Sequence, residues 1–133
     1  MYDLEEIAPG LCAYAATITF KADEPLKTAL WRQQSQELFN YLAKAIKETP
    51  QTVIGHIKGY LNLKEQGYYY FSNVGKPPTF VTGEGEGETE TAQLDINVLV
   101  FNLPQEEISV LLKQGLLKHF SGVSFQVEEE REE

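Results

Sequence analysis

The order of predicted elements in this 133-residue chain indicates an α+β fold of the ferredoxin-like, or split βαβ, type. Stretches with apolar residues at every second position, typical of strands, alternate with stretches whose apolar residues recur every three or four positions, typical of amphipathic helices. The predicted order is strand, helix, three strands, helix and strand. We therefore expect a mainly antiparallel sheet with two helices on one face and an extra hairpin strand. This resemblance concerns topology alone, since no motif identifies a family.

Length and composition predict one domain over residues 1–127, because 133 residues with 42% hydrophobic content are enough for one core. The single cysteine excludes an intrachain disulfide. The net charge of −9 is concentrated in two segments. Residues 83–91 hold four Glu, and residues 128–133 hold five Glu and one Arg. We expect a flexible acidic loop at 75–92, with a short strand at 79–82 as an alternative for part of it, and a disordered acidic tail at 128–133.

Residues 11–20 predict the first strand. Tyr14, Ile18 and Phe20 share one face, and small or mildly polar residues share the other: Ala13, Ala15, Thr17 and Thr19.

The first helix is predicted to begin near Asp23, a favourable N-cap, with Pro25 in its first turn. Leucine and isoleucine then recur at multiples of four, and the helix ends before Pro50. The apolar stripe comprises Leu26, Leu30, Leu38, Leu42 and Ile46.

The stretch "VIGHIKGYLNL" at 53–63 predicts a strand whose core-facing side carries Val53, Ile57, Leu61 and Leu63. Gly55 and Gly59 lie on the same side and allow a helix to approach closely. Its other face is polar and carries His56, Lys58, Tyr60 and Asn62.

A turn near Gly67 then leads into a tyrosine-rich strand whose two faces are both bulky. The tyrosines at 68–70, Trp31 and Phe39 are expected to pack. In an alternative interpretation, Trp31 and Phe39 form an interface patch with the tyrosines.

Residues 93–101 alternate, with Leu94, Ile96, Val98 and Val100 facing the core and Asp95 and Asn97 facing away. Asn102 is predicted to cap the second helix, with Gln105 reaching back. A helical stripe from Ile108 to Leu116 and a final strand at 122–127 follow.

The uncovered side of the predicted sheet, called the open face below, carries the candidate binding residues. They are His56, Lys58, Tyr60, Asn62, Asp95 and Asn97. In a functional interpretation, His56 shuttles protons or binds a metal, Lys58 holds an anion, Tyr60 donates a hydrogen bond and Asp95 orients the imidazole. In a structural interpretation these are polar residues on the solvent-exposed side of a sheet. The alternation of apolar and polar residues in an antiparallel sheet is enough to explain them. The remaining members are Ala13, Ala15, Thr17, Thr19, Ser124 and Gln126.

Composition also argues against several classes of function. Few basic residues and no Lys/Arg cluster disfavour nucleic acid as a partner. We expect no membrane partner, because no stretch approaches the roughly 18 apolar residues of a membrane span and the acidic N-terminus does not resemble a signal peptide. A cytoplasmic location follows as an expectation. Two histidines and one cysteine make a metal site a weak prediction, and the sequence identifies no cofactor.

Two hypotheses for function come from this sequence. The first is a non-enzymatic binding or assembly module that forms a homo-oligomer, simplest as a homodimer, through its open face, with a further protein partner possible at the acidic segments. The alternative is a small-molecule or metal-cofactor binding protein, either an accessory protein or a small enzyme, that uses the polar face around His56.

Overall fold

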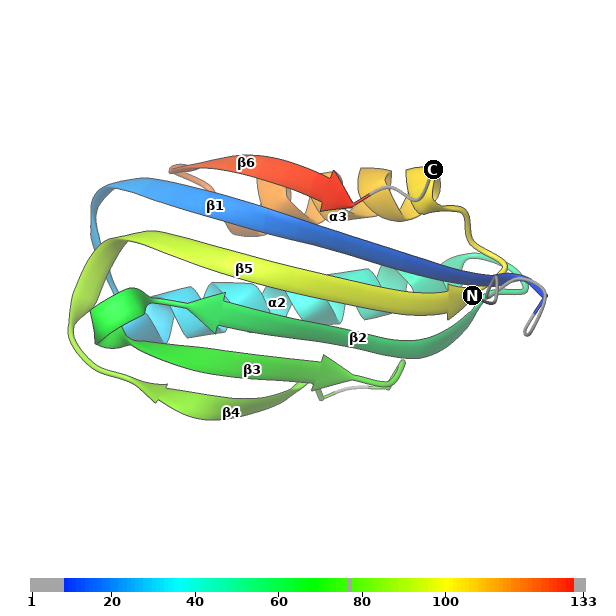
Figure 1. The fold of residues 1–133 in the computed structure, drawn as a ribbon, viewed down its shortest axis with the longest axis horizontal. Coiled ribbons are helices and arrows are strands. Elements are labelled where there is room, and N and C mark those ends of the chain that lie inside the picture. The colour runs from blue at the N-terminus through cyan, green and yellow to red at the C-terminus, as the bar shows by residue number, and fades with distance from the viewer. Residues whose placement is uncertain (1–8, 77, 131–133) are drawn as a thin grey trace.

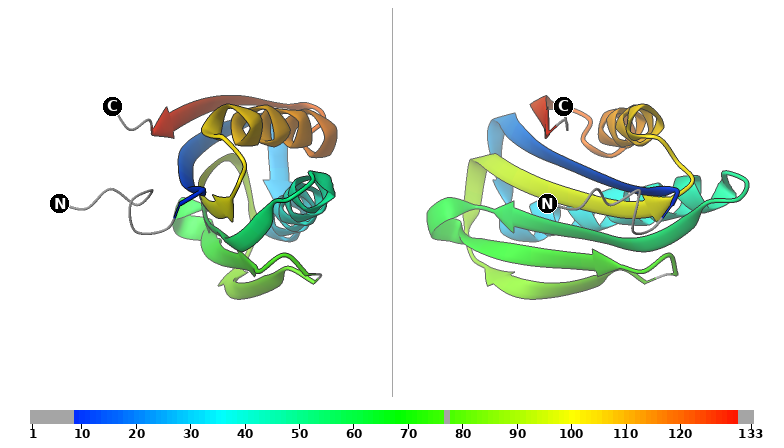
Figure 2. Two further views of the ribbon diagram at one scale, coloured as in Figure 1. Left: turned by 90° about the vertical axis from the view of Figure 1, so that its right-hand side faces the viewer. Right: turned by 45° about the vertical axis from the view of Figure 1, so that its right-hand side comes forward.

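The computed structural model describes residues 9–76 and 78–130 and shows an α+β fold with one six-stranded antiparallel sheet. The order of the strands across the sheet is β4-β3-β2-β5-β1-β6. Helices α2 and α3 lie on the same side of the sheet, and no helix of the described residues lies on the opposite side (Figures 1 and 2). In chain order the elements are β1 (Leu11–Lys27), α2 (Thr28–Glu48), β2 (Val53–Asn62), the short helix η1 (Lys64–Gln66), β3 (Gly67–Asn73), β4 (Phe80–Gly85), β5 (Glu88–Phe101), α3 (Gln105–His119) and β6 (Val123–Glu130).

The six-stranded sheet agrees with the predicted α+β class and with two helices on one face. The predicted hairpin strand is present as β3, and the sheet has one strand more than the predicted five, because β4 follows β3 and extends the sheet beyond it. Its order therefore differs from that of a four-stranded ferredoxin-like sheet. No helix among the described residues is long and apolar enough to cross a membrane.

The core lies between the sheet and the two helices. Alternation predicted its strand contributions correctly, since Ile18, Phe20, Leu94, Ile96 and Val98 are all buried. On α2 the predicted stripe is only partly right: Leu38, Leu42 and Ile46 are buried, whereas Leu30 is exposed.

Trp31 and Phe39 belong to this core, which confirms the prediction that they pack and rules out the alternative that they join an interface patch. Both side chains are fully buried. The Trp31 ring lies 5.6 Å from that of Phe20, and its Nε1 donates a hydrogen bond to the carbonyl of Thr89. Phe39 stacks on Phe71, with ring centroids 5.1 Å apart. The helical spacing placed both residues on a flank of the stripe, but the sheet covers that flank as well.

The first strand runs further than predicted, through the Asp23–Pro25 segment that was expected to begin the helix. After a register shift between Lys21 and Leu26, the strand resumes pairing with the start of β5. The helix begins only at Thr28, whose N–H donates to the carbonyl of Gly87. Backbone pairing with β5 therefore outweighs the local capping signal, because it satisfies several donors and acceptors rather than one.

The segment 75–92 was predicted as a flexible loop, and this prediction was wrong for most of its length, whereas the alternative of a short strand at 79–82 agrees with the structure. Residues 80–85 form β4, and β5 begins at Glu88. The glycines that indicated flexibility allow backbones to approach instead. An ideal Cβ at Gly83 (φ +125°) would lie only 2.3 Å from the carbonyl oxygen of Tyr68. A side chain there would break the β3–β4 ladder, so glycine is required.

The acidic tail was predicted to be disordered, but its first three residues, Glu128–Glu130, are the last residues of β6 and pair with β1. Residues 131–133 lie outside the described part of the chain. The backbone of these glutamates pairs with β1, and amino-acid composition alone could not predict this pairing. The acidic charge at 128–130 is thus held on the sheet.

The predicted cap of the second helix was also wrong. Pro104 occupies the N-cap position of α3, and no side chain caps it. Asn102 Nδ2 donates instead to the carbonyl of Gln51, and Gln105 Nε2 donates to the carbonyl of Ala13 at 2.8 Å. Both side chains therefore join separate segments rather than closing a local turn.

Of the two glycines on β2, only Gly59 allows a close helix approach. An ideal Cβ at Gly59 would lie 2.2 Å from Cζ of Phe39 on α2. Gly55 instead sits at a β-bulge between Ile54 and His56 and faces Leu99. The bulge moves Val53 off the core side, where it was predicted, and leaves it exposed.

Candidate functional site

All six predicted site residues lie on the open face, because β2 and β5 pair in a register that aligns their polar positions. Lys58 lies opposite Asn97, Tyr60 opposite Asp95, and Asn62 opposite Gln93. His56 lies opposite Leu99, at the end of the face nearest the bulge. The six residues therefore form two adjacent columns rather than one convergent cluster.

The expected pairing of Asp95 with His56 is absent. Asp95 accepts a hydrogen bond from Thr17 Oγ1 at 2.9 Å, across the β1–β5 ladder. Its neighbour on β2 is Tyr60, four residues along the strand from His56, a separation of about 13 Å at the usual rise per residue. Asp95 thus stabilises cross-strand pairing and does not orient the imidazole.

Asn62 also has a local structural role. Its Oδ1 accepts a hydrogen bond of 2.8 Å from the backbone N–H of Lys64, where the chain turns from β2 towards β3. Lys64 has a positive φ of 56°, a conformation that such a turn supports.

His56 is half-buried next to Lys58. Burial lowers the pKa of His56 below its ordinary value of 6.5, and the positive charge of Lys58 lowers it further. The imidazole is therefore neutral at pH 7, with a nitrogen able to accept a hydrogen bond. Within residues 9–76 and 78–130, no three His, Cys, Asp or Glu side chains are grouped so that they would hold a metal ion.

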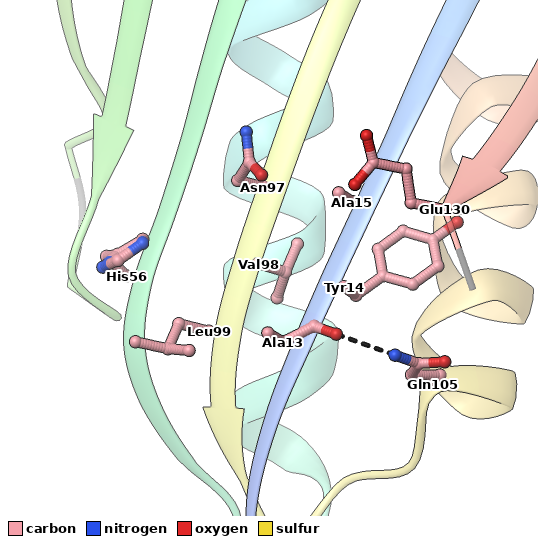
Figure 3. A pocket seen from close by; sticks show the side chains of 9 residues that line it. All are labelled: Ala13, Tyr14, Ala15, His56, Asn97, Val98, Leu99, Gln105 and Glu130. Carbon is pink, nitrogen blue, oxygen red and sulfur yellow. Dashed lines mark hydrogen bonds between the residues drawn. The ribbon is translucent and has the colours of Figure 1, made fainter. Parts of the chain in front are cut away.

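A hollow of about 280 Å³, the alanine hollow, separates His56 from the edge of β6 (Figure 3). Its floor is low because the side chains of Ala13 and Ala15 on β1 are small, while Leu99 and His56 stand on one side and Glu130 on the other. Gln105 closes one end by holding the carbonyl of Ala13, which β6 does not reach. The complete lining comprises Ala13, Tyr14, Ala15, His56, Asn97, Val98, Leu99, Gln105 and Glu130.

Three tyrosines form the most prominent group on the other half of the open face. Tyr60 on β2 lies opposite Tyr70 on β3, with ring centroids 4.9 Å apart, and Tyr68 contacts both. Tyr70 is 53% exposed and Tyr68 is 39% exposed, whereas Tyr69, between them, is buried. We call this group, Tyr60, Tyr68 and Tyr70, the tyrosine ridge.

Sequence reasoning placed only Tyr60 of the ridge on the open face, and it left the face of the tyrosines at 68–70 undecided. In the run Tyr68–Phe71 both faces are bulky, so alternation does not decide which tyrosines face out. The register of the β2–β3 hairpin decides the question, because paired residues on neighbouring strands point to the same side of the sheet. Asn62 pairs with Tyr68 and Tyr60 pairs with Tyr70, so Tyr68 and Tyr70 lie on the open face beside Tyr60. Gln105 and Glu130 of the alanine hollow were also missed, because their positions depend on how α3 and β6 pack against β1.

Comparisons with known proteins give only a distant structural similarity. No protein-family model matches this chain, and no curated protein matches it. The chain is similar to the crystal structure of the Zn(II)-bound YjiA GTPase from E. coli, with 14% sequence identity and a TM-score of 0.45, over 86% of this chain and 32% of that one. A Zn(II)-bound triple mutant of YjiA GTPase has a TM-score of 0.43 at the same identity and coverage. This chain thus spans about a third of the length of those structures.

Proposed function

We propose that this protein is a small non-enzymatic assembly module whose open face binds a second copy of the same chain. The observation that carries this proposal is the tyrosine ridge: three rings in mutual contact, two of them on β3 and exposed. They lie on a sheet face that no helix within residues 9–76 and 78–130 covers. Tyrosine is enriched at protein interfaces, because it buries a large apolar area while its hydroxyl group keeps a polar partner.

The shape of the open face supports a symmetric pair. The tyrosine ridge lies on β2 and β3, and the alanine hollow lies over β1, on the other side of β5. The ridge also lies further along the strands than the hollow, since Tyr60 is level with Thr17, and Ala15 and Ala13 lie two and four residues away on β1. A two-fold axis in the plane of the interface and inclined to the strands places the ridge of each copy over the hollow of the other. The tyrosine hydroxyls then meet His56, Asn97 and Glu130, which offer hydrogen-bond partners.

The area of the face indicates a modest affinity. Six strands spaced by about 4.8 Å span roughly 24 Å, and eight residues of strand extend for about 26 Å. The resulting area of roughly 600 Å² per copy is somewhat below the roughly 800 Å² of a standard interface. The dimer is therefore expected to dissociate on dilution.

The topology around this face supports the ferredoxin-like assignment in an extended form. The neighbours β2, β5, β1 and β6, together with α2 and α3, give the order strand, helix, strand, strand, helix, strand expected of a split βαβ unit. In this proposal β3 and β4 are an addition at the β2 edge, and the addition brings Tyr68 and Tyr70.

Sedimentation velocity over a range of concentrations tests the dimer. Tyr70→Ser removes part of the ridge and Ala15→Gln fills the hollow, so each variant alone should sediment as a monomer where the parent chain is a dimer. An equimolar mixture of the two should recover dimer in part, because a mixed pair keeps one intact ridge-to-hollow contact. Val110→Ser on α3 is the matched control, since Val110 has the same exposed fraction of 53%. A parent chain that is monomeric at every concentration overturns the proposal.

The alternative function, a small-molecule site around His56, is favoured by one observation: the neutral imidazole lines the 280 Å³ hollow. A ligand with a hydrogen-bond donor fits such a site. Native mass spectrometry of the purified protein should then show a retained mass on the monomer, and His56→Ala should abolish it without unfolding the chain. Retention of that mass by the variant would place the ligand elsewhere.

A further inference from the structure

A second site lies away from the open face, at the C-terminal end of α2. There the connection between β3 and β4 lies at the same end of the molecule as the last turns of α2 (Figure 1). A hollow of about 300 Å³ lies between them, lined by Asn40, Ala43, Lys44, Lys47, Asn73 and Gly75. An adjoining hollow of about 240 Å³ shares Lys47 and Gly75 and adds Thr52, Val53, Ile54, Val74 and Lys76. We call the two together the lysine groove.

Charge distinguishes this groove from the rest of the surface. The chain carries a net charge of −9, yet Lys44, Lys47 and Lys76 all line the groove, and none of the described acidic residues lines it. In the described part of the chain, none of the three ammonium groups lies within 4.0 Å of a carboxylate. Lys44 lines the first hollow, Lys76 lines the second and Lys47 lines both, so three cations without an acidic partner border one continuous groove and favour an anion.

The walls of the groove are apolar and the stems of the lysines extend them. Ala43 is buried at the base, Ile54 packs against the core, and Val74 is exposed beside Lys76. Lysine side chains contribute methylene groups to such a wall while their charged ends remain in water. The groove therefore offers an apolar surface bordered by positive charge.

A buried polar network holds the loop side of the groove in place. Asn73, which is 1% exposed, donates from Nδ2 to Thr79 Oγ1 at 3.0 Å and accepts from the N–H of Gly75 at 2.7 Å. Thr79 Oγ1 in turn donates to Oδ1 of Asn40 on α2, and Gln36 Nε2 donates to the Thr79 carbonyl. Residues on both sides of the β3–β4 connection are thus tied to α2, so the groove is formed before any ligand binds.

We infer that the lysine groove binds a small organic anion with a compact apolar body, such as an aryl or alkyl carboxylate. A cavity of 300 Å³ lies at the lower end of the range for small-molecule sites, which excludes large cofactors from the main hollow. The apolar body lies against Ala43 and the lysine stems, and the carboxylate lies among the three ammonium groups. This inference is independent of the open face.

The test uses 4-phenylbutyrate as the probe and 4-phenylbutan-1-ol as its uncharged analogue, followed by amide chemical shifts of the isotope-labelled chain. A ligand with this number of atoms is expected to bind with a dissociation constant of about 1 mM. Shifts should concentrate at residues 40–47, 52–54 and 73–76, and the alcohol should bind distinctly more weakly than the carboxylate. Equal binding of the two probes, or shifts centred on His56 instead, overturns the inference.

Charge variants provide the second arm. The triple variant Lys44→Gln, Lys47→Gln, Lys76→Gln should weaken binding of 4-phenylbutyrate by about tenfold, as expected from three partly exposed ion pairs. The control Lys27→Gln, Lys64→Gln, Lys118→Gln changes the net charge equally with exposed residues outside the groove, and should bind as the parent does. An equal loss in both variants would show a nonspecific charge effect and overturn the site. Tyr70→Ser must keep binding, so failure of the dimer and failure of this site are distinguishable.

Discussion

The hydroxyl group of Tyr14 donates a hydrogen bond of 2.6 Å to Oε2 of Glu129, on the side of the sheet that faces the helices. Tyr14 lies on β1 and Glu129 on β6, the last strand of the chain. Lys113 on α3 donates to the other carboxylate oxygen at 3.4 Å, and Ser109 also bonds to this carboxyl group. The carboxylate therefore joins β1, β6 and α3.

The ionisation of Glu129 should make stability depend on pH. Burial raises the pKa of Glu129, but hydrogen bonds from Ser109 and Tyr14 and the charge of Lys113 outweigh it and lower the pKa from 4.5 to about 2. A carboxyl group whose pKa is lower in the folded chain stabilises the folded state at pH values above the pKa of the unfolded chain. This stabilisation is lost as the pH falls from about 4.5 to about 2. For a side chain that is 10% exposed, the shift corresponds to roughly 3 kcal/mol.

Glu129→Gln should thus lower the free energy of unfolding at pH 7, as measured by urea titration, and the loss should shrink at pH 3. Glu130→Gln is the matched control, because Glu130 is the exposed neighbour on the same strand. A loss of the same size at both pH values would contradict the proposed role of ionisation.

Gly59→Ala should destabilise the protein by roughly 1–3 kcal/mol, the usual cost of overpacking a core. The new Cβ would meet Cζ of Phe39, whose ring is held against Phe71. The double variant Gly59→Ala, Phe39→Leu should show a coupling free energy by thermal unfolding, because the shorter side chain relieves the contact. Strictly additive effects would mean that the β2–α2 approach is looser than the structure indicates.

The imidazole of His56 should titrate below pH 6.5 in the folded chain, as followed by its ring resonances. Because burial is the largest cause of the lowered pKa, Lys58→Gln should raise the pKa of His56 only part of the way back. The unfolded chain takes up the proton first, so His56 should reduce stability as the pH falls through 6.5. A pKa above 6.5 would indicate a nearby carboxylate and revive the predicted pairing with Asp95.

Gln105→Ala should cost about 1 kcal/mol, since it removes the side-chain hydrogen bond to the Ala13 carbonyl at the end of the alanine hollow. Gln114→Ala, at an exposed position of the same helix, is the control for helix propensity. Amide hydrogen exchange should show faster opening of residues 11–14 in the Gln105 variant alone. Equal exchange in both variants would show that Gln105 does not secure this end of β1.

Periodicity in the sequence was sufficient to predict the faces of β1 and β5. Side chains alternate strictly along an extended strand, so Ile18 and Leu94 had to share a side that Thr17 and Asp95 did not. The same reasoning placed His56 and Lys58 on the open face without showing what they meet there. Whether that face binds a second copy stays a prediction.

Pairing between strands decided the rest, because it depends on residues far apart in the chain. Residues 26–27 and 80–85 read locally as a helix start and a loop, yet they form strands because β5 and β3 offer them backbone partners. Only this register brings Tyr68 and Tyr70 beside Tyr60, and only the packing of α2 against the β3–β4 connection brings Lys44 and Lys76 to one groove. The sequence by itself therefore determined the faces of the regular elements, whereas the tertiary structure decided which side chains meet, since local propensity carries no information on long-range register.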